Sequence, residues 1–243
     1  MRQAQPDRNR FHGHRAAPCF RLESEAVVQH LGIENRAARA VQILAQLLDL
    51  QPLPVSSLKN SKFEALYPGT RHFNSIQTQV FSALYETDDN VLLAAPAGSG
   101  KLWCAEFAIM RAFSQNENAR CVYVALKEEV VDQIFFSWEL RFGRSLGKTV
   151  VKIESDDTHN MKKLADCHIA VASAEAWDRV SRRWRRRKVV KAVDLFICDN
   201  LHLIGSEQGH LLEAVVSRMR FMASQLKEQL SHRLRIVGLS ASV

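Results

Sequence analysis

The sequence predicts an α/β domain in which a parallel sheet is covered by helices on both faces. From about residue 60 onward, short apolar runs alternate with segments of helical spacing, and this alternation is typical of a parallel sheet with helical crossovers. A glycine-rich loop also lies between the first predicted strand and the helix that follows it. In folds of this class that junction is where phosphate groups bind.

The elements follow from the spacing of apolar residues. Strands are predicted at 91–94, 121–126, 149–153, 168–172, 195–198 and 234–239. Helices are predicted at 102–113, 128–142, 161–164, 174–187 and 208–230. The segment 23–50 also has helical spacing, and Gly32 is a point where that run can divide into two helices.

The N-terminal part is expected to differ from the rest. Residues 1–22 are rich in Arg and His. A transit peptide has a similar composition, but a disordered tail is preferred because no clear amphipathic pattern is present. We therefore expect a disordered tail and helical extension over 1–46, followed by the α/β domain over 47–243.

Composition narrows the class of protein. The chain has 243 residues, of which 47% are hydrophobic, and a formal net charge of +7. No apolar run is long enough to cross a membrane, and the positive balance favours an anionic partner such as nucleic acid. The five cysteines are scattered without C-x-x-C spacing. This indicates reduced, intracellular cysteines, and a zinc site is not expected.

The glycine-rich loop reads Ala-Pro-Ala-Gly-Ser-Gly-Lys-Leu. Glycines let the backbone N–H groups turn toward phosphate, and Lys101 supplies a positive charge. The usual pattern has Ser or Thr after the lysine as a Mg²⁺ ligand, whereas Leu102 has no oxygen to offer. The residues predicted to bind the nucleotide here are Ala95, Pro96, Ala97, Gly98, Ser99, Gly100, Lys101 and Leu102.

A second motif, Asp199-Asn-Leu-His202, follows an apolar strand. An aspartate at this point of a phosphate-loop protein usually holds Mg²⁺, so Asp199 is the predicted metal residue. A following glutamate would activate the attacking water, but Asn200 is neutral and a poor base. Asp199, Asn200 and His202 are the predicted catalytic positions.

Three weaker signals complete the predicted site. Phe73 could stack on adenine, and the amide of Gln77 could pair with the edge of the base. At the other end of the chain, Ser240 and Ser242 could bond to His202 and couple the nucleotide site to a neighbouring lobe.

A basic run, Arg182-Arg-Trp-Arg-Arg-Arg-Lys188, has no assigned role in this site. It could bind RNA phosphates, the acidic face of a protein or an import receptor. A solvated helix end would have the same composition.

Taken in order, these motifs resemble the superfamily-two helicases of the DExH branch. Within that branch the chain looks like the large two-cassette spliceosomal RNA helicases, and like the first RecA-like lobe of their second, degenerate cassette. The stretches 47–55, 73–81, 177–184 and 202–209 carry this likeness. The chain departs from the family pattern at Leu102 and Asn200, and also at Ala97, Leu126 and Ala174. The last two lie in segments that would grip the nucleic acid backbone.

The resemblance implies a helicase ATP-binding lobe that acts in pre-mRNA splicing in the nucleus, with ATP as cofactor and weak or absent Mg²⁺ binding. Spliceosomal proteins are the expected partners, and RNA could bind the basic surface. The sequence ends where a second RecA-like lobe would follow. Three hypotheses therefore stay open: a hydrolysis-poor regulator or scaffold, an ATP-dependent helicase domain that is active when joined to its second lobe, and a truncated product without a function.

Overall fold

The computed structural model describes residues 51–154, 159–207, 209–226 and 234–241. The predicted tail and helices of 1–46 lie outside these residues, as do Ser242 and the last part of the helix predicted at 208–230. The four cysteines in the described ranges are free and buried. None of the described helices is both long and apolar enough to span a membrane.

Six parallel strands form one sheet, in the order β1-β6-β5-β2-β4-β3. Their bounds are Val91–Ala94 (β1), Cys121–Ala125 (β2), Val150–Ile153 (β3), Ile169–Ser173 (β4), Leu195–Cys198 (β5) and Arg235–Ser240 (β6). The strands are short and mostly apolar, and all but the edge strand β3 are buried almost throughout, as a sheet covered on both faces requires. This confirms the α/β fold class with a parallel sheet flanked by helices.

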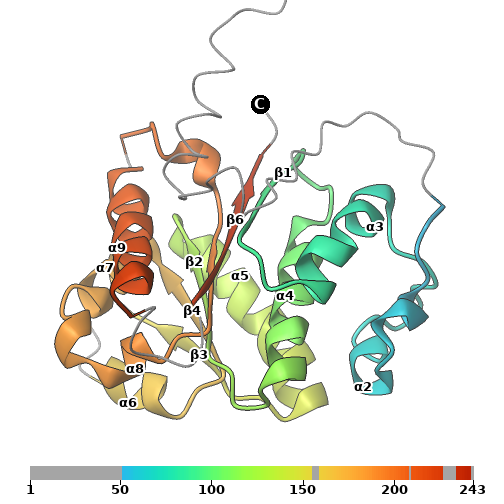
Figure 1. The fold of residues 1–243 in the computed structure, drawn as a ribbon, viewed down its shortest axis with the longest axis horizontal. Helices are drawn as coiled ribbons and strands as arrows, with labels where there is room; N and C mark the ends of the chain where they lie inside the picture. Colours follow the sequence, from blue (N-terminus) through green and yellow to red (C-terminus); the bar gives the residue numbers. More distant parts are fainter. Residues whose placement is uncertain (1–50, 155–158, 208, 227–233, 242–243) are drawn as a thin grey trace, which may run out of the picture.

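Two helical layers cover the sheet (Figure 1). One face packs against α3 (Ser75–Phe81), α4 (Lys101–Gln115) and α5 (Glu128–Trp138), and the other against α7 (Ala174–Ser181) and α9 (His210–Leu226). Alternate strand residues serve opposite faces: Tyr123 packs with the α4 layer, and Val124 packs with the α9 layer. This is the period of two that β-strands impose.

Smaller elements join these layers. They are η1 (Val55–Leu58), α2 (Ser61–Glu64), the π-helical turns η2 (Ser82–Glu86) and η3 (Glu139–Arg144), α6 (Asn160–Ala165), η4 (Trp184–Arg186), α8 (Lys188–Lys191) and η5 (Leu201–Leu203). The helix predicted at 128–142 is thus α5 followed by the π-helical turn η3, which the periodicity does not distinguish from an α-helix.

The prediction of a single helix over 174–187 was wrong, because the structure divides this range into α7 and η4, and α8 begins just after it. Arg187 adopts an extended conformation with φ −109° and ψ 97°, and its guanidinium donates to the carbonyl of Val180 at the end of α7. Arg218 on α9 donates to the carbonyl of Asp178. The Asp178 carbonyl also accepts the helical N–H of Arg182, so the Arg187 contact is the one that replaces a helical bond, and α7 ends early.

Candidate nucleotide site

The glycine-rich loop lies at the carboxyl edge of the sheet, between the end of β1 and the start of α4 (Figure 1). Gly98 and Gly100 have φ angles of 76° and 84°, in the left-handed region that glycine tolerates. A Cβ atom at Gly100 would lie 2.4 Å from the side-chain nitrogen of Gln77. Glycine is therefore required at this position both by the backbone angle and by the close approach of α3.

The start of α4 is open to a ligand. No side chain caps this helix, so its first N–H groups lack the partner that an N-cap side chain would supply. The Ser99 hydroxyl oxygen is buried and has no hydrogen-bond partner in the structure. Unpartnered donors at the N-terminus of a long helix favour an anion, so the loop fits the phosphates of a nucleotide.

Lys101 provides the positive charge of the loop. Its Nζ donates to the carbonyls of Ala95 (2.7 Å) and Pro96 (2.8 Å), so the side chain folds back over the loop. Burial lowers the pKa of this lysine, and the nearby carboxylate of Asp199 opposes that shift. The fold therefore brings the loop close to Asp199 at the end of β5, although the two are about a hundred residues apart in the chain.

The start of α3 holds the loop from outside. Asn74 and Gln77 form a capping box, in which each side chain accepts a hydrogen bond from the backbone N–H of the other. The remaining side-chain nitrogens point to the loop: Asn74 Nδ2 donates to the Ser99 carbonyl at 3.0 Å, and Gln77 Nε2 to the Gly100 carbonyl at 3.5 Å. The sequence analysis overlooked Asn74, although the N-x-x-Q spacing before a helix was a readable capping signal.

The two residues predicted to contact the base are placed differently from that prediction. Gln77 is buried, and its amide contacts the loop backbone. The Phe73 ring is only 1% exposed and packs against Phe107, with ring centroids 4.9 Å apart, and against Tyr67 and Phe81. In this structure Phe73 offers no face on which a base could stack, because its neighbours cover it.

Asp199 follows β5 and lies opposite the loop. Its Oδ2 accepts a hydrogen bond from the hydroxyl of Tyr123 at 2.6 Å, and its Oδ1 accepts one from the backbone N–H of Asn200 at 2.7 Å. Burial and the adjacent carboxylate raise the pKa of Tyr123 well above its usual range, so the phenol remains a donor. Tyr123 was missed from the sequence, although a hydroxyl in a buried strand usually has a polar partner.

These contacts bear on whether the residues fit Mg²⁺. Leu102 stands where the hydroxyl ligand is expected, and its side chain packs partly against the hydrophobic core. Asp199 then remains as the metal-binding side chain of the two motifs, and both of its oxygens already accept hydrogen bonds. The loop fits nucleotide phosphates, and the two motifs offer Mg²⁺ one side-chain ligand instead of two, so waters and phosphate oxygens would have to complete its octahedron.

Asn200 and His202 complete the motif. Asn200 has φ 60°, a left-handed conformation that Asn tolerates better than most residues. His202 Nδ1 accepts a hydrogen bond from the backbone N–H of Ala241 at 3.1 Å. Burial lowers the pKa of His202, and Lys101 adds to the effect while Asp199 opposes it, so the neutral ring can keep this acceptor role.

The predicted bond from Ser240 to His202 is absent from the described residues. The Ser240 hydroxyl instead donates to the carbonyl of Ala241 at 3.0 Å. The end of β6 therefore contacts His202 through backbone rather than through a hydroxyl. Ser242 lies outside the described residues.

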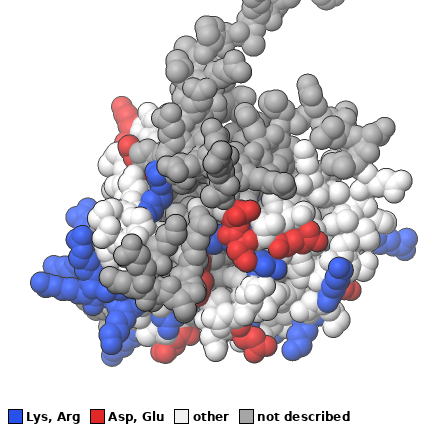
Figure 2. Space-filling model, viewed as in Figure 1, with Lys and Arg blue, Asp and Glu red and all other residues white. Residues whose placement is uncertain are grey.

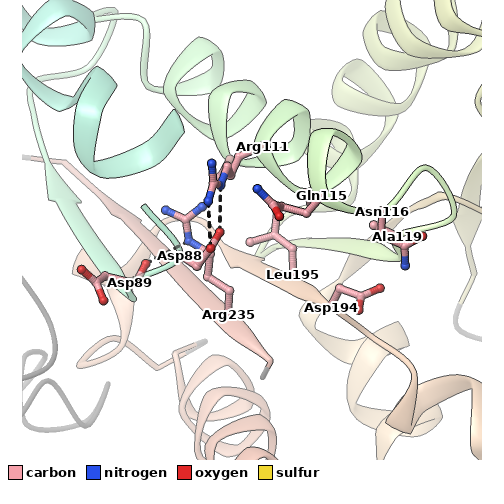
Figure 3. A pocket seen from close by; sticks show the side chains of 11 residues that line it. Asp88, Asp89, Arg111, Gln115, Asn116, Ala119, Asp194, Leu195 and Arg235 are labelled. Carbon is pink, nitrogen blue, oxygen red and sulfur yellow. Dashed lines mark hydrogen bonds and ion pairs between the residues drawn. The ribbon is translucent and has the colours of Figure 1, made fainter. Parts of the chain in front are cut away.

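A separate cavity of about 620 Å³ opens at the opposite, amino edge of the sheet (Figure 3). Arg111 lines it and pairs with Asp88 at 2.9 Å. Arg235, also in its wall, donates to the carbonyls of Asp89, Leu84 and Ala83. Both arginines of this cavity thus have partners within the fold, and none of its lining residues belongs to the phosphate loop.

With this geometry the chain matches known helicases. The DEAD/DEAH box helicase family model covers residues 74–243. The DExH-box ATP-dependent RNA helicase DExH12 of Arabidopsis thaliana is 48% identical over 200 residues, which are 82% of this chain and 9% of that protein. The human U5 small nuclear ribonucleoprotein 200 kDa helicase is 46% identical over 199 residues, again 82% of this chain and 9% of the relative.

A further relative and a solved structure agree. Activating signal cointegrator 1 complex subunit 3 of Danio rerio is 42% identical over 226 residues, or 91% of this chain and 14% of the relative. The chain thus spans 9% to 14% of the length of these relatives. The crystal structure of the DUF1998 helicase MrfA bound to DNA and AMPPNP superposes with a TM-score of 0.61 over 90% of this chain and 31% of that chain, at 13% identity. That likeness shows the RecA-like fold alone. The family match over residues 74–243 shows that the chain belongs to the DEAD/DEAH box helicases.

Proposed function

We propose that this chain is a degenerate ATP-binding lobe of a DExH-type RNA helicase, which binds nucleotide but hydrolyses it poorly. The asymmetry of the site supports this. The loop keeps its left-handed glycines, an uncapped helix start and Lys101, whereas Leu102 and Asn200 stand where a metal ligand and a general base would be. Binding needs the N–H groups and the cation, but hydrolysis also needs the metal and an activated water.

Each residue of the site has a proposed role in nucleotide binding. The N–H groups of 97, 98 and 100–102 and the Lys101 ammonium would hold the phosphates, while Gln77 and Asn74 fix the loop backbone. Tyr123 would orient Asp199. His202 would couple nucleotide binding to the position of the segment after β6, through its hydrogen bond with Ala241. Bound Mg²⁺, where present, would supply charge neutralisation to the phosphates.

The biological setting follows from the relatives. Identities of 46% to 48% connect the chain to a U5 small nuclear ribonucleoprotein helicase and to a DExH-box RNA helicase. We place its action in pre-mRNA splicing in the nucleus, as a regulator or scaffold, with spliceosomal proteins and RNA as partners. A scaffold role needs a stable fold and a docking surface, and neither depends on turnover.

The motif residues that are still present at the site favour a second candidate function. Lys101, Asp199 and His202 are all present, so an ATP-dependent helicase domain that works together with a second lobe is the alternative. RNA-stimulated phosphate release that Lys101→Ala abolishes would establish the alternative and contradict the hydrolysis-poor reading.

The direct test is the affinity of the chain for ATP and ADP, measured by isothermal titration calorimetry with Mg²⁺ and with EDTA. We expect micromolar affinity that changes little when Mg²⁺ is removed. Strong dependence on Mg²⁺ would show that another group replaces the missing hydroxyl of Leu102. Absence of binding in both conditions would contradict the nucleotide site itself.

A further inference from the structure

The basic run of the sequence forms a surface far from the nucleotide site. Because α7 descends from the carboxyl end of β4, the run that follows it lies near the amino edge of the sheet, on η4 and α8. Figure 2 shows Lys and Arg gathered on the lower left of the molecule, where Figure 1 places α7 and α8. We define the basic surface as the side chains of Arg183, Arg185, Arg186 and Lys188.

Neighbouring arginines of the same run are used by the fold. Arg182 pairs with the nearly buried carboxylate of Asp178, which Arg218 also contacts at 2.8 Å. Arg187 donates to the carbonyl of Val180. These contacts close the end of α7 and fix the direction in which the rest of the run leaves it.

Few acidic side chains neutralise the positive charges of the basic surface. Arg183, Arg186 and Lys188 are exposed, and no ion pair joins any of them to an acidic residue of the described ranges. No acidic residue occurs between Arg179 and Lys191 in the sequence. This part of the molecule therefore carries a local excess of positive charge that the fold does not need.

Aromatic side chains lie within the basic surface. The guanidinium of Arg185 sits 5.0 Å from the ring centre of Trp184 and 5.8 Å from that of Phe221 on α9. Trp184 is only 7% exposed, but 48% of Phe221 is exposed. Arg185 is thus held in place by cation–π contacts, beside an apolar ring that faces solvent.

We propose that the basic surface and Phe221 together form a docking site for an acidic protein segment that carries an apolar side chain. Protein interfaces are enriched in arginine and aromatic residues and depleted in lysine, and three of the four cations are arginines, which bind carboxylates through two parallel hydrogen bonds. An RNA backbone would use the positive charge alone, whereas an acidic segment with an apolar side chain would use the arginines and the exposed part of Phe221 together.

This inference deepens the scaffold role proposed above and rests on it, but it does not depend on nucleotide binding. The basic surface lies at the amino edge of the sheet and the phosphate loop at the carboxyl edge. A ligand at one site therefore leaves the other open, and the two proposals can fail separately.

The test uses the full chain and fluorescence anisotropy with three labelled probes of equal length. The first is an Asp/Glu peptide with one central leucine, the second has serine in place of that leucine, and the third is a single-stranded oligouridine. The variants are R183E/R186E, which reverses two charges, and Phe221→Ser. The control is K62E/R71E, which reverses two exposed charges elsewhere. ATP affinity is measured for each variant.

We expect R183E/R186E to weaken binding of the leucine peptide by about tenfold or more, since it replaces two attractive surface ion pairs with repulsion, while the control binds as the wild type does. Phe221→Ser should abolish the preference for leucine over serine. Tighter binding of oligouridine that R183E/R186E removes would overturn the proposal in favour of RNA. Equal loss in the control, or a leucine preference that survives Phe221→Ser, would overturn it too. Retained ATP affinity separates these outcomes from a failure of the nucleotide site.

Discussion

The two halves of the nucleotide site differ in how firmly the fold depends on them. The phosphate-binding half is the loop and α4, and buried polar contacts support it. The half that would bind metal and activate water consists of Leu102, Asp199 and Asn200. Leu102 packs against the core, and Asn200 suits its left-handed backbone. These two residues fit the fold as they are, so the loss of hydrolytic groups need not weaken the structure.

The support behind the phosphate half centres on Glu106, one turn beyond the start of α4. Its carboxylate is fully buried and accepts hydrogen bonds from Tyr67, Trp138 and Arg141 at 2.7–3.0 Å. Trp138 also contacts the ring of Tyr123 edge-on, with centroids 5.1 Å apart. This cluster links α4 to η3 and, through Tyr123, to Asp199. The comparison teaches that buried hydrogen bonds hold the phosphate half in place, whereas Leu102 and Asn200 can lack hydrolytic groups without disturbing the fold.

The largest effect should come from removing the partner of Glu106. Arg141→Met would leave a buried carboxylate without its cation and should lower the free energy of unfolding by about 3–5 kcal/mol. Urea denaturation measures it. The matched control is Arg144→Met, whose exposed ion pair with Glu139 is 3.6 Å long and should change stability by less than about 0.5 kcal/mol. Equal stability of the two variants would show that the cluster does not anchor α4.

The second prediction concerns pH. Burial raises the pKa of Glu106 from 4.5 to about 7, although Arg141 and the hydrogen bonds oppose the shift. The folded state therefore binds more protons than the unfolded state between these values, and stability should fall as pH rises from about 4.5 to about 7. The fall should be about 2–4 kcal/mol in total. Comparison of urea midpoints with Glu106→Gln isolates this contribution, since that variant cannot titrate. Parallel curves for the two proteins would refute it.

The third prediction tests the binding half directly. Lys101→Ala removes the charge aimed at the phosphates and should weaken ATP about 10- to 100-fold, as the loss of a charge-assisted hydrogen bond of about 1.5–3 kcal/mol implies. Calorimetry with Lys62→Ala as the control measures it, because Lys62 is exposed on α2. An unchanged affinity would place the nucleotide elsewhere.

The smallest effect should come from restoring a metal ligand to the half of the site that would bind Mg²⁺. Leu102→Thr restores one oxygen ligand, and ATP affinity should then improve about tenfold when Mg²⁺ replaces EDTA, or about 1.4 kcal/mol. Leu102→Val is the control, since valine has nearly the shape of threonine without the hydroxyl. If both variants gain the same Mg²⁺ dependence, the effect arises from packing, and the missing hydroxyl is not its cause.

The strands and the glycine-rich loop were predictable because each depends on local sequence. A run such as Leu195–Cys198 has no other stable place than a buried strand, and Gly98 and Gly100 permit backbone angles that few residues adopt. The end of α7 was not predictable, because it depends on the Arg187 guanidinium turning back to the Val180 carbonyl. Phe73 and Gln77 were associated with the base, yet their positions depend on contacts with α4 and the loop.

By itself, the sequence determined that the chain has a parallel α/β fold with a phosphate loop, and that it lacks a hydroxyl after Lys101 and an acid after Asp199. These are properties of composition and order along the chain. Only the tertiary structure decided that Tyr123 binds Asp199, that Glu106 anchors the phosphate helix and that Phe221 lies beside Arg185. Such contacts join residues from separate elements, and their partners are chosen by how the helices and strands pack.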